Sequence, residues 1–267
     1  MKLFLKSWLS NIGPLKTHYN RSLFCDLDKL VFDEENNIIM DWSCKCGCSI
    51  AISMMFEHLG LLKEAKKLKN KKWVHAYRRS TYTPKHPVSH KSLCDDSNFL
   101  FKVVRNPYTR IVSSYIHVCR YIKQNLLELK DIGTYRQLTF RQFVALLENR
   151  NIKFDIDPHC RMQTKNYERR NLRQPVIFKL ETLAQDVEKI NAACNVNYSL
   201  QGLTAHHHAD KNAQNIEFSA DESFASFDGV YPDYNYFYDQ KNFEKVTQLY
   251  KEDIERYEYD FPWEEIT

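Results

Sequence analysis

Two short stretches of this 267-residue chain carry the residue types that hold phosphate. The first loop, residues 44–49, reads Cys-Lys-Cys-Gly-Cys-Ser and lies between a short apolar run and a long apolar segment. Gly47 lets the backbone approach an anion closely. Ser49 is a good N-cap and a hydroxyl donor, and the helix expected there turns its positive end toward the anion. Lys45 adds a cation with three donors.

The second stretch reads Arg-Asn-Pro-Tyr-Thr-Arg-Ile-Val-Ser over residues 105–113 and is called the second loop below. Arg105 follows an apolar strand, and an arginine there can fork onto a phosphate. Ser113 lies two turns into the next helix and can reach the same anion. Each stretch alone also fits a structure without a ligand. The first fits an ordinary strand–turn–helix junction, and the second fits a surface arginine beside a helix. Together they indicate a nucleotide with phosphates at both ends.

A metal site is the other interpretation of the first loop. Cys44, Cys46 and Cys48 are three thiols that zinc accepts, and residues 206–208 are histidines. The Cys-x-Cys-x-Cys spacing differs from that of common zinc sites. A helix that begins at residue 49 also keeps the three side chains from converging. We therefore predict no metal. The loop is not a Walker motif either, since Lys45 precedes the glycine.

Strands that alternate with helices predict an α/β fold whose sheet is mostly parallel. We expect a single domain over residues 1–267, with no internal repeat and no linker. The strands are expected at Asn37–Trp42, Phe99–Val104 and Val176–Leu180, and the helices at Ser49–Leu62, Tyr108–Leu129, Thr139–Glu148, Glu181–Cys194 and Phe243–Tyr257. We expect irregular structure at Trp73–Asp96 and Gly202–Tyr236, and Thr139 as an N-cap.

Composition narrows the class of protein. A net charge of +4 is too small to indicate nucleic acid binding, but it suits an anionic small ligand. No apolar run reaches the roughly 20 residues of a membrane helix, and the N-terminal run is short for a signal peptide. We therefore expect a soluble, cytoplasmic protein with no membrane partner. The eight cysteines are then free thiols rather than a disulfide framework.

Both loops, in this order, resemble the sulfotransferase superfamily. The similarity is to the branch that contains Golgi carbohydrate sulfotransferases and their bacterial relatives, whose loops read Pro-Lys-Val-Gly-Cys-Thr-Ser and Arg-Asp-Pro-Phe-x-Arg-Leu-Val-Ser-x-Tyr. Three further matches are residues 157–164 (Asp-Pro-His-Cys-Arg-Met-Gln-Thr), the strand and turn of residues 176–183, and the tyrosines of the last helix. The resemblance covers about residues 38–260, with cysteines at 44, 46 and 160 as departures.

The resemblance implies a P-loop-kinase-like, three-layer fold. It also implies the donor 3′-phosphoadenosine-5′-phosphosulfate, with adenosine 3′,5′-bisphosphate as the product and no metal required. In relatives the first loop holds the 5′-phosphosulfate, while the arginine and serine of the second loop hold the 3′-phosphate. Carried over, the donor-binding residues are Lys45, Cys46, Gly47, Cys48, Ser49, Ile50, Arg105 and Ser113. A polar segment with His207 and Lys211 is expected to close over the nucleotide.

Lys45 and His159 are the predicted catalytic residues. Lys45 is expected to stabilise the leaving phosphate. His159 suits a general base at neutral pH, with Asp155 and Asp157 near enough in sequence to orient it. The alternatives for the base are His58 and His75.

The expected acceptor is a hydroxyl or amine of a carbohydrate or a small natural product. A P-loop-type kinase and a non-catalytic nucleotide- or glycan-binding module stay open as rival functions.

Overall fold

The computed structural model describes residues 27, 29–68, 73–121, 137–154, 156–203, 220–227 and 231–263. Its sheet has the strands β1 Val31–Asp33, β2 Ile38–Trp42, β3 Phe99–Val104 and β4 Val176–Lys179, in the order β1-β2-β3-β4. β2, β3 and β4 are parallel, whereas β1 is an antiparallel edge strand that the sequence did not predict. The predicted α/β fold with a mostly parallel sheet is confirmed.

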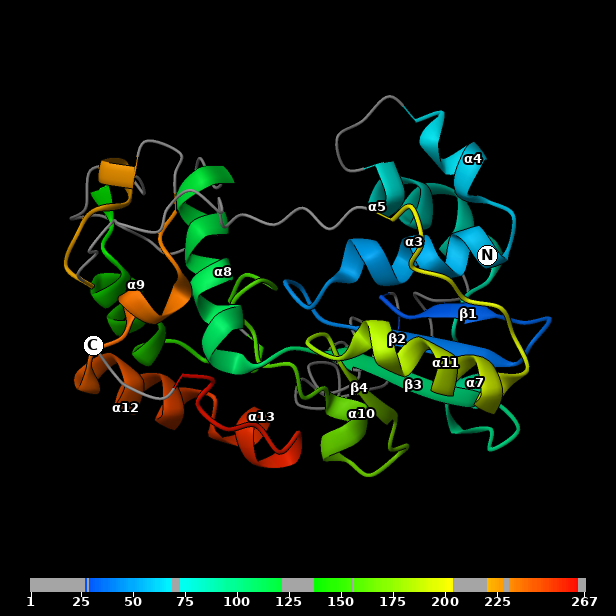
Figure 1. Cartoon of the computed structure of the whole chain (residues 1–267). Helices are drawn as coiled ribbons and strands as arrows, with labels where there is room; N and C mark the ends of the chain where they lie inside the picture. The colour runs from blue at the N-terminus through cyan, green and yellow to red at the C-terminus, as the bar shows by residue number, and fades with distance from the viewer. Residues whose placement is uncertain are drawn as a thin grey trace, which may run out of the picture.

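Side chains alternate between the two faces of the sheet, as they do in any strand. Ile38, Met40 and Phe101 pack into one core together with α3 (Cys48–His58), α5 (Trp73–Tyr77) and α11 (Leu183–Cys194). Ile39 and Leu100 pack into a core on the other face with side chains from α7 (His90–Cys94) and α10 (Asn166–Arg169). Figure 1 shows α3, α4 (Leu62–Lys66) and α5 gathered on one side of the sheet.

A second cluster of helices lies beyond the end of the strands at which β3 leads into α8 (Figure 1). α8 (Pro107–Tyr121), α9 (Phe140–Glu148) and α12 (Gln240–Leu249) share one large apolar core. The predicted N-cap of α9 is confirmed, because the Thr139 hydroxyl accepts a hydrogen bond from the Gln142 amide at 3.1 Å. No helix among these described ranges is long and apolar enough to span a bilayer.

Two predicted segments differ from the structure. Residues 73–85 and 90–94 are helical rather than irregular: α5 continues into a π-helical turn at Arg78–Tyr82 and α6 at Thr83–Lys85, and α7 follows after a short gap that contains Pro87. These helices are too short for an apolar repeat. The last helix is broken into α12 and α13 (Lys251–Arg256) at Tyr250, whose buried hydroxyl donates to the Cys160 carbonyl at 2.6 Å.

The remaining irregular stretch is only partly described. Its described residues contain two 3-10 turns, η3 at Phe224–Phe227 and η4 at Tyr234–Phe237. Residues 204–219, which include the predicted nucleotide-closing residues His207 and Lys211, lie outside the described residues. Asp155 and the three histidines of the zinc alternative are outside them as well.

Candidate functional site

The two phosphate-holding loops leave the same edge of the sheet. β2 and β3 are parallel neighbours, with Trp42 opposite Val103, so the chain turns out of both strands side by side. The Arg105 guanidinium Nη1 donates to the Lys45 carbonyl at 3.2 Å. The sequence separates these loops by about sixty residues, and the sheet brings them into direct contact.

The first loop is a tight turn between β2 and α3. Lys45 and Gly47 both have left-handed backbone angles, with φ of 69° and 68°. A Cβ atom on Gly47 would lie 2.4 Å from Leu180 Cδ1, so a larger residue would have to displace Leu180. Glycine is the residue that adopts these angles without steric cost. The loop is thus shaped by its own glycine and by the residue that follows β4.

The N-terminus of α3 is the second element of this loop. Its N-cap is Gly47, and no side chain of the described residues bonds to the cap. The prediction that Ser49 caps the helix is wrong: Ser49 is the second helical residue, and its Oγ lies 3.0 Å from His75 Nε2. The amides of Cys48, Ser49 and Ile50 have no partner within the helix, so they draw an anion to the positive end of the dipole.

Lys45 carries the charge of the first loop. Burial, together with the positive charges of Arg105 and Arg110, lowers the pKa of its ammonium to about 8. A cation held beside two other cations is destabilised until negative charge arrives. The loop is therefore electrostatically prepared for an anion.

Arg105 precedes α8, and its side chain reaches the helix face that carries Thr109 and Ser113. Arg105 Nε donates to Thr109 Oγ1 at 3.0 Å, and Ser113 follows Thr109 by one helical turn. Residues four apart share a helix face. Ser113 is only 2% exposed. The Arg105 guanidinium donates hydrogen bonds to Thr109 and to the Lys45 carbonyl, two of the five that it can donate. It also lies 5.5 Å from the Tyr234 ring centre.

Arg110 and Ser114 occupy the neighbouring face of α8, and the sequence did not single them out as site residues. The buried Arg110 donates from Nε to the Cys44 carbonyl at 2.9 Å and from Nη2 to the His159 carbonyl at 3.4 Å. Ser114 Oγ donates to the same His159 carbonyl at 2.6 Å. Arg110 thus connects the first loop to the segment of His159. The sequence signal for this connection is a charged residue on a helix whose neighbouring positions are apolar and buried.

His159 and Asp157 form a hydrogen-bonded pair beside the first loop. His159 Nδ1 lies 2.6 Å from Asp157 Oδ1, which also accepts the His159 amide at 2.8 Å. Burial favours the neutral acid, but the hydrogen bonds from His159 outweigh it and hold the pKa of the Asp157 carboxyl below its usual value. The ring of His117 on α8 stacks on that of His159, with centroids 3.8 Å apart. Nδ1 is therefore occupied, and Nε2 is the nitrogen left for a proton.

The other two histidines considered for the base lie elsewhere. His58 is the last residue of α3 and packs edge-on against Tyr198 with ring centroids 5.0 Å apart, at the end of the helix opposite the loop. His75 does lie at the loop, against Ser49 and Cys48.

The three cysteines of the first loop do not converge on a metal. Cys46 is fully buried and its thiol donates to Gln163 Oε1 at 2.8 Å, whereas Cys48 Sγ lies 3.6 Å from His75 Nε2. Burial raises the pKa of Cys46 to about 11 and that of Cys48 to about 12, so both thiols stay protonated at neutral pH. Within the described part of the chain, no group of three or more metal-ligating side chains is arranged to hold an ion.

A small cavity opens between the first loop and the His159 segment. Both Cys44 and Pro158, the neighbours of Lys45 and His159, line it. The charged side chains that line it are all basic: Lys29, Lys153, Arg161, Lys165 and Arg169. Part of this charge is compensated, because Lys165 pairs with Asp41 and both Lys153 and Arg169 pair with Glu252.

The structure combines a mostly parallel sheet, a helix N-terminus after the second strand and a cluster of cations beside a histidine–carboxylate pair. This arrangement suits an α/β protein that acts on an anionic substrate. The Sulfotransferase family model matches residues 28–260, and the chain belongs to this family. The resemblance drawn from the loops is thereby confirmed. Membership implies a transferase that takes a sulfuryl group from a sulfate donor to an acceptor. No curated protein and no solved structure matches the chain.

Proposed function

We propose that this protein transfers a sulfuryl group from 3′-phosphoadenosine-5′-phosphosulfate to a hydroxyl or amine of a carbohydrate or small natural product. The bond between sulfur and the bridging phosphate oxygen breaks, and a bond between sulfur and the acceptor oxygen or nitrogen forms. Adenosine 3′,5′-bisphosphate leaves, and the acceptor proton passes to a base. The observation that carries the proposal is that Arg105 contacts the Lys45 carbonyl, while Arg110 joins the first loop, at Cys44, to the segment of the His159–Asp157 pair.

The two loops fit the two charged ends of this donor. The amides of residues 46–50 and the Lys45 ammonium take the 5′-phosphosulfate, and Arg105 with Ser113 takes the 3′-phosphate. A nucleoside triphosphate carries its phosphates at one end only and would leave the second loop unused. His207 and Lys211 close over the nucleotide in this proposal.

Lys45 and His159 supply the chemical step. Charge builds on the bridging oxygen as the phosphate leaves, and an ammonium placed there lowers the barrier. His159 Nε2 accepts the acceptor proton, while Asp157 holds Nδ1 and stabilises the imidazolium that forms. The remainder of the rate enhancement comes from in-line alignment of donor and acceptor. The acceptor approaches from the cavity between Cys44 and Pro158.

A kinase is the first rival function, and the residues disfavour it. β3 ends at Val104 and is followed by Arg105 rather than by a carboxylate suited to magnesium. The carboxylate on β2, Asp41, is fully buried and pairs with Lys102 and Lys165. A binding module without catalysis is the second rival, which the retained His159–Asp157 pair disfavours. Cytoplasmic location and a single domain stay predictions.

Titration calorimetry tests the donor, with adenosine 3′,5′-bisphosphate compared with ATP and magnesium. We expect binding of the bisphosphate and at least tenfold weaker binding of ATP. Labelled donor incubated with host extract, followed by a mass search for products heavier by one sulfuryl group, then identifies the acceptor. Tight magnesium-dependent ATP binding without bisphosphate binding would overturn the proposal in favour of a kinase.

A further inference from the structure

Gln163 contacts both phosphate-holding loops with one side chain. Its Oε1 accepts the Arg105 amide and the Cys46 thiol, each at 2.8 Å, and its Nε2 donates to the Arg105 carbonyl at 2.8 Å. The side chain therefore pairs with both backbone groups of Arg105, as a neighbouring strand would. Gln163 is completely buried, so water cannot replace these bonds.

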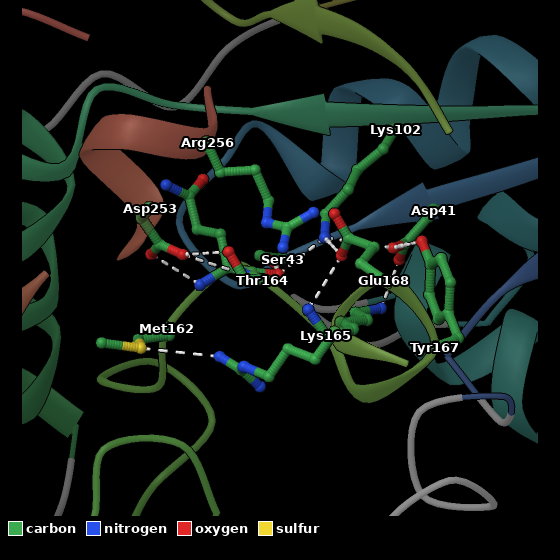
Figure 2. Close-up of polar contacts among 12 residues, drawn as sticks. Asp41, Ser43, Lys102, Met162, Thr164, Lys165, Tyr167, Glu168, Asp253 and Arg256 are labelled. Carbon is green, nitrogen blue, oxygen red and sulfur yellow. Dashed lines mark hydrogen bonds and ion pairs between the residues drawn. The ribbon is translucent and has the colours of Figure 1, made fainter. Parts of the chain in front are cut away.

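The backbone of Gln163 is held as firmly as its side chain. Its amide donates to Asp253 Oδ2 at 2.7 Å, and its carbonyl accepts from Lys102 Nζ at 2.6 Å and from Ser43 Oγ at 3.5 Å. The next residue, Thr164, donates both its amide and its hydroxyl to Asp253 Oδ1 at 2.8 Å. Figure 2 shows Asp253 and Thr164 facing each other in this way.

Beside Thr164, a buried set of charges ties the segment to the sheet (Figure 2). Lys102 on β3 pairs with Glu168, and Asp41 on β2 pairs with Lys165. Tyr257 donates to Glu168 Oε1 at 2.8 Å. Buried charges keep such partners only in well-defined geometry. Gln163 is thus fixed to the sheet and to α13, and it presents a rigid amide to the two loops.

We infer that Gln163 is a positioning residue that sets the spacing between the first and second loops for the two charged ends of the donor. The inference rests on the proposed function. The backbone of Arg105 decides where its guanidinium points, and Cys46 lies between Lys45 and Gly47. His159 lies four residues before Gln163, so the same anchor sets the base relative to the donor. Site residues held within about half an ångström depend on such supporting contacts.

The test substitutes Gln163→Met, which keeps the length and removes all three side-chain hydrogen bonds. We expect adenosine 3′,5′-bisphosphate to bind about 10- to 100-fold more weakly by titration calorimetry, because misaligned loops lose one to two hydrogen bonds to the bisphosphate, each worth roughly tenfold in affinity. The Michaelis constant for the donor rises with it, and the turnover number falls because His159 shifts too.

Asn191→Leu is the matched control. Asn191 makes the same pair of bonds to a backbone, donating to the Tyr198 carbonyl at 2.9 Å and accepting the Tyr198 amide at 2.7 Å. Tyr198 packs at the far end of α3, against His58. We expect both variants to lower the melting temperature, and only Gln163→Met to lose bisphosphate affinity.

Gln163→Glu keeps the test decisive if the methionine variant fails to fold. Its carboxylate still accepts from Arg105 and Cys46 but cannot donate to the Arg105 carbonyl; protonation restores that donor. We expect its affinity, relative to wild type at each pH, to recover as pH falls. Equal bisphosphate affinity of wild type and Gln163→Met, or a Gln163→Glu affinity that equals wild type at every pH, would overturn the inference alone. Absence of bisphosphate binding to the wild type would instead overturn the proposed function.

Discussion

Replacement of Lys45 by methionine tests the electrostatics of the first loop. Burial and two neighbouring arginines lower the pKa of Lys45 from 10.5 to about 8. At about 1.4 kcal/mol for each pH unit, the protonated amine costs the empty fold about 3 kcal/mol, and partial exposure to solvent reduces this. We therefore expect Lys45→Met to stabilise the ligand-free protein by about 1 to 3 kcal/mol at pH 7.

The sign of the pH dependence follows from the same shift. The folded-state pKa lies below the unfolded value, so the penalty is complete below pH 8 and is lost between about pH 8 and 10.5. The stability advantage of Lys45→Met should disappear over this range. Lys91→Met is the control, because Lys91 lies exposed on α7. Denaturant unfolding at several pH values measures the difference.

Donor binding should show the opposite preference. The bound bisphosphate keeps Lys45 protonated, so wild-type affinity should fall about 30-fold between pH 7 and pH 9.5. Lys45→Met should bind weakly and show no such slope. If the variant is no more stable than wild type at pH 7, and wild-type affinity is flat with pH, the loop is not the prepared anion site described above.

Three further predictions concern single side chains. His159→Ala should lower the turnover number about 100- to 10,000-fold while bisphosphate affinity changes less than about threefold, because a general base acts in the transition state and not on the donor; unchanged turnover would remove His159 from the mechanism. Gly47→Ala should destabilise the fold and abolish bisphosphate binding, because the new Cβ meets Leu180 at 2.4 Å. Gly60→Ala is the control: its φ is also 68° but no atom lies within 4 Å, so it should carry only the backbone strain of about 1 kcal/mol. Equal effects of the two variants on thermal unfolding would show that Leu180 moves aside easily. Lys102→Met should destabilise by about 3 to 5 kcal/mol by denaturant unfolding, since it leaves the buried Glu168 without its cation and Asp41 with Lys165 alone. A loss under about 1 kcal/mol would mean that Glu168 takes up a proton instead.

The strands and the main helices were predictable from local patterns. β3 was predicted with the observed bounds, and β2 and β4 within one residue at each end, because each is an apolar run bounded by polar or turn residues. The N-cap of α9 was predictable from Thr139 for the same local reason. These features depend on residues within a few positions of one another.

The short helices and the helix break were not predictable in this way. α5 to α7 are three to five residues long, and such helices hold together by packing rather than by their own propensity. α12 ends at Leu249 because Tyr250 leaves helical geometry and reaches the Cys160 carbonyl, 90 residues away in the chain. The pairing of β1 with β2 depends likewise on tertiary structure, because a strand of three residues forms only where a neighbouring strand is available to pair with it.

The sequence by itself determined which groups are available: a lysine and a glycine before a buried helix, an arginine before a second one, and a histidine two residues after an aspartate. It also determined their order, which was sufficient for the family. Only the tertiary structure decided which of these groups meet, and that Arg110 and Gln163 join them. Gln163 lies 58 residues from Arg105 and 117 from Cys46 along the chain. Hydrogen bonds at such separations depend on how the parallel strands align, and no local pattern encodes that alignment.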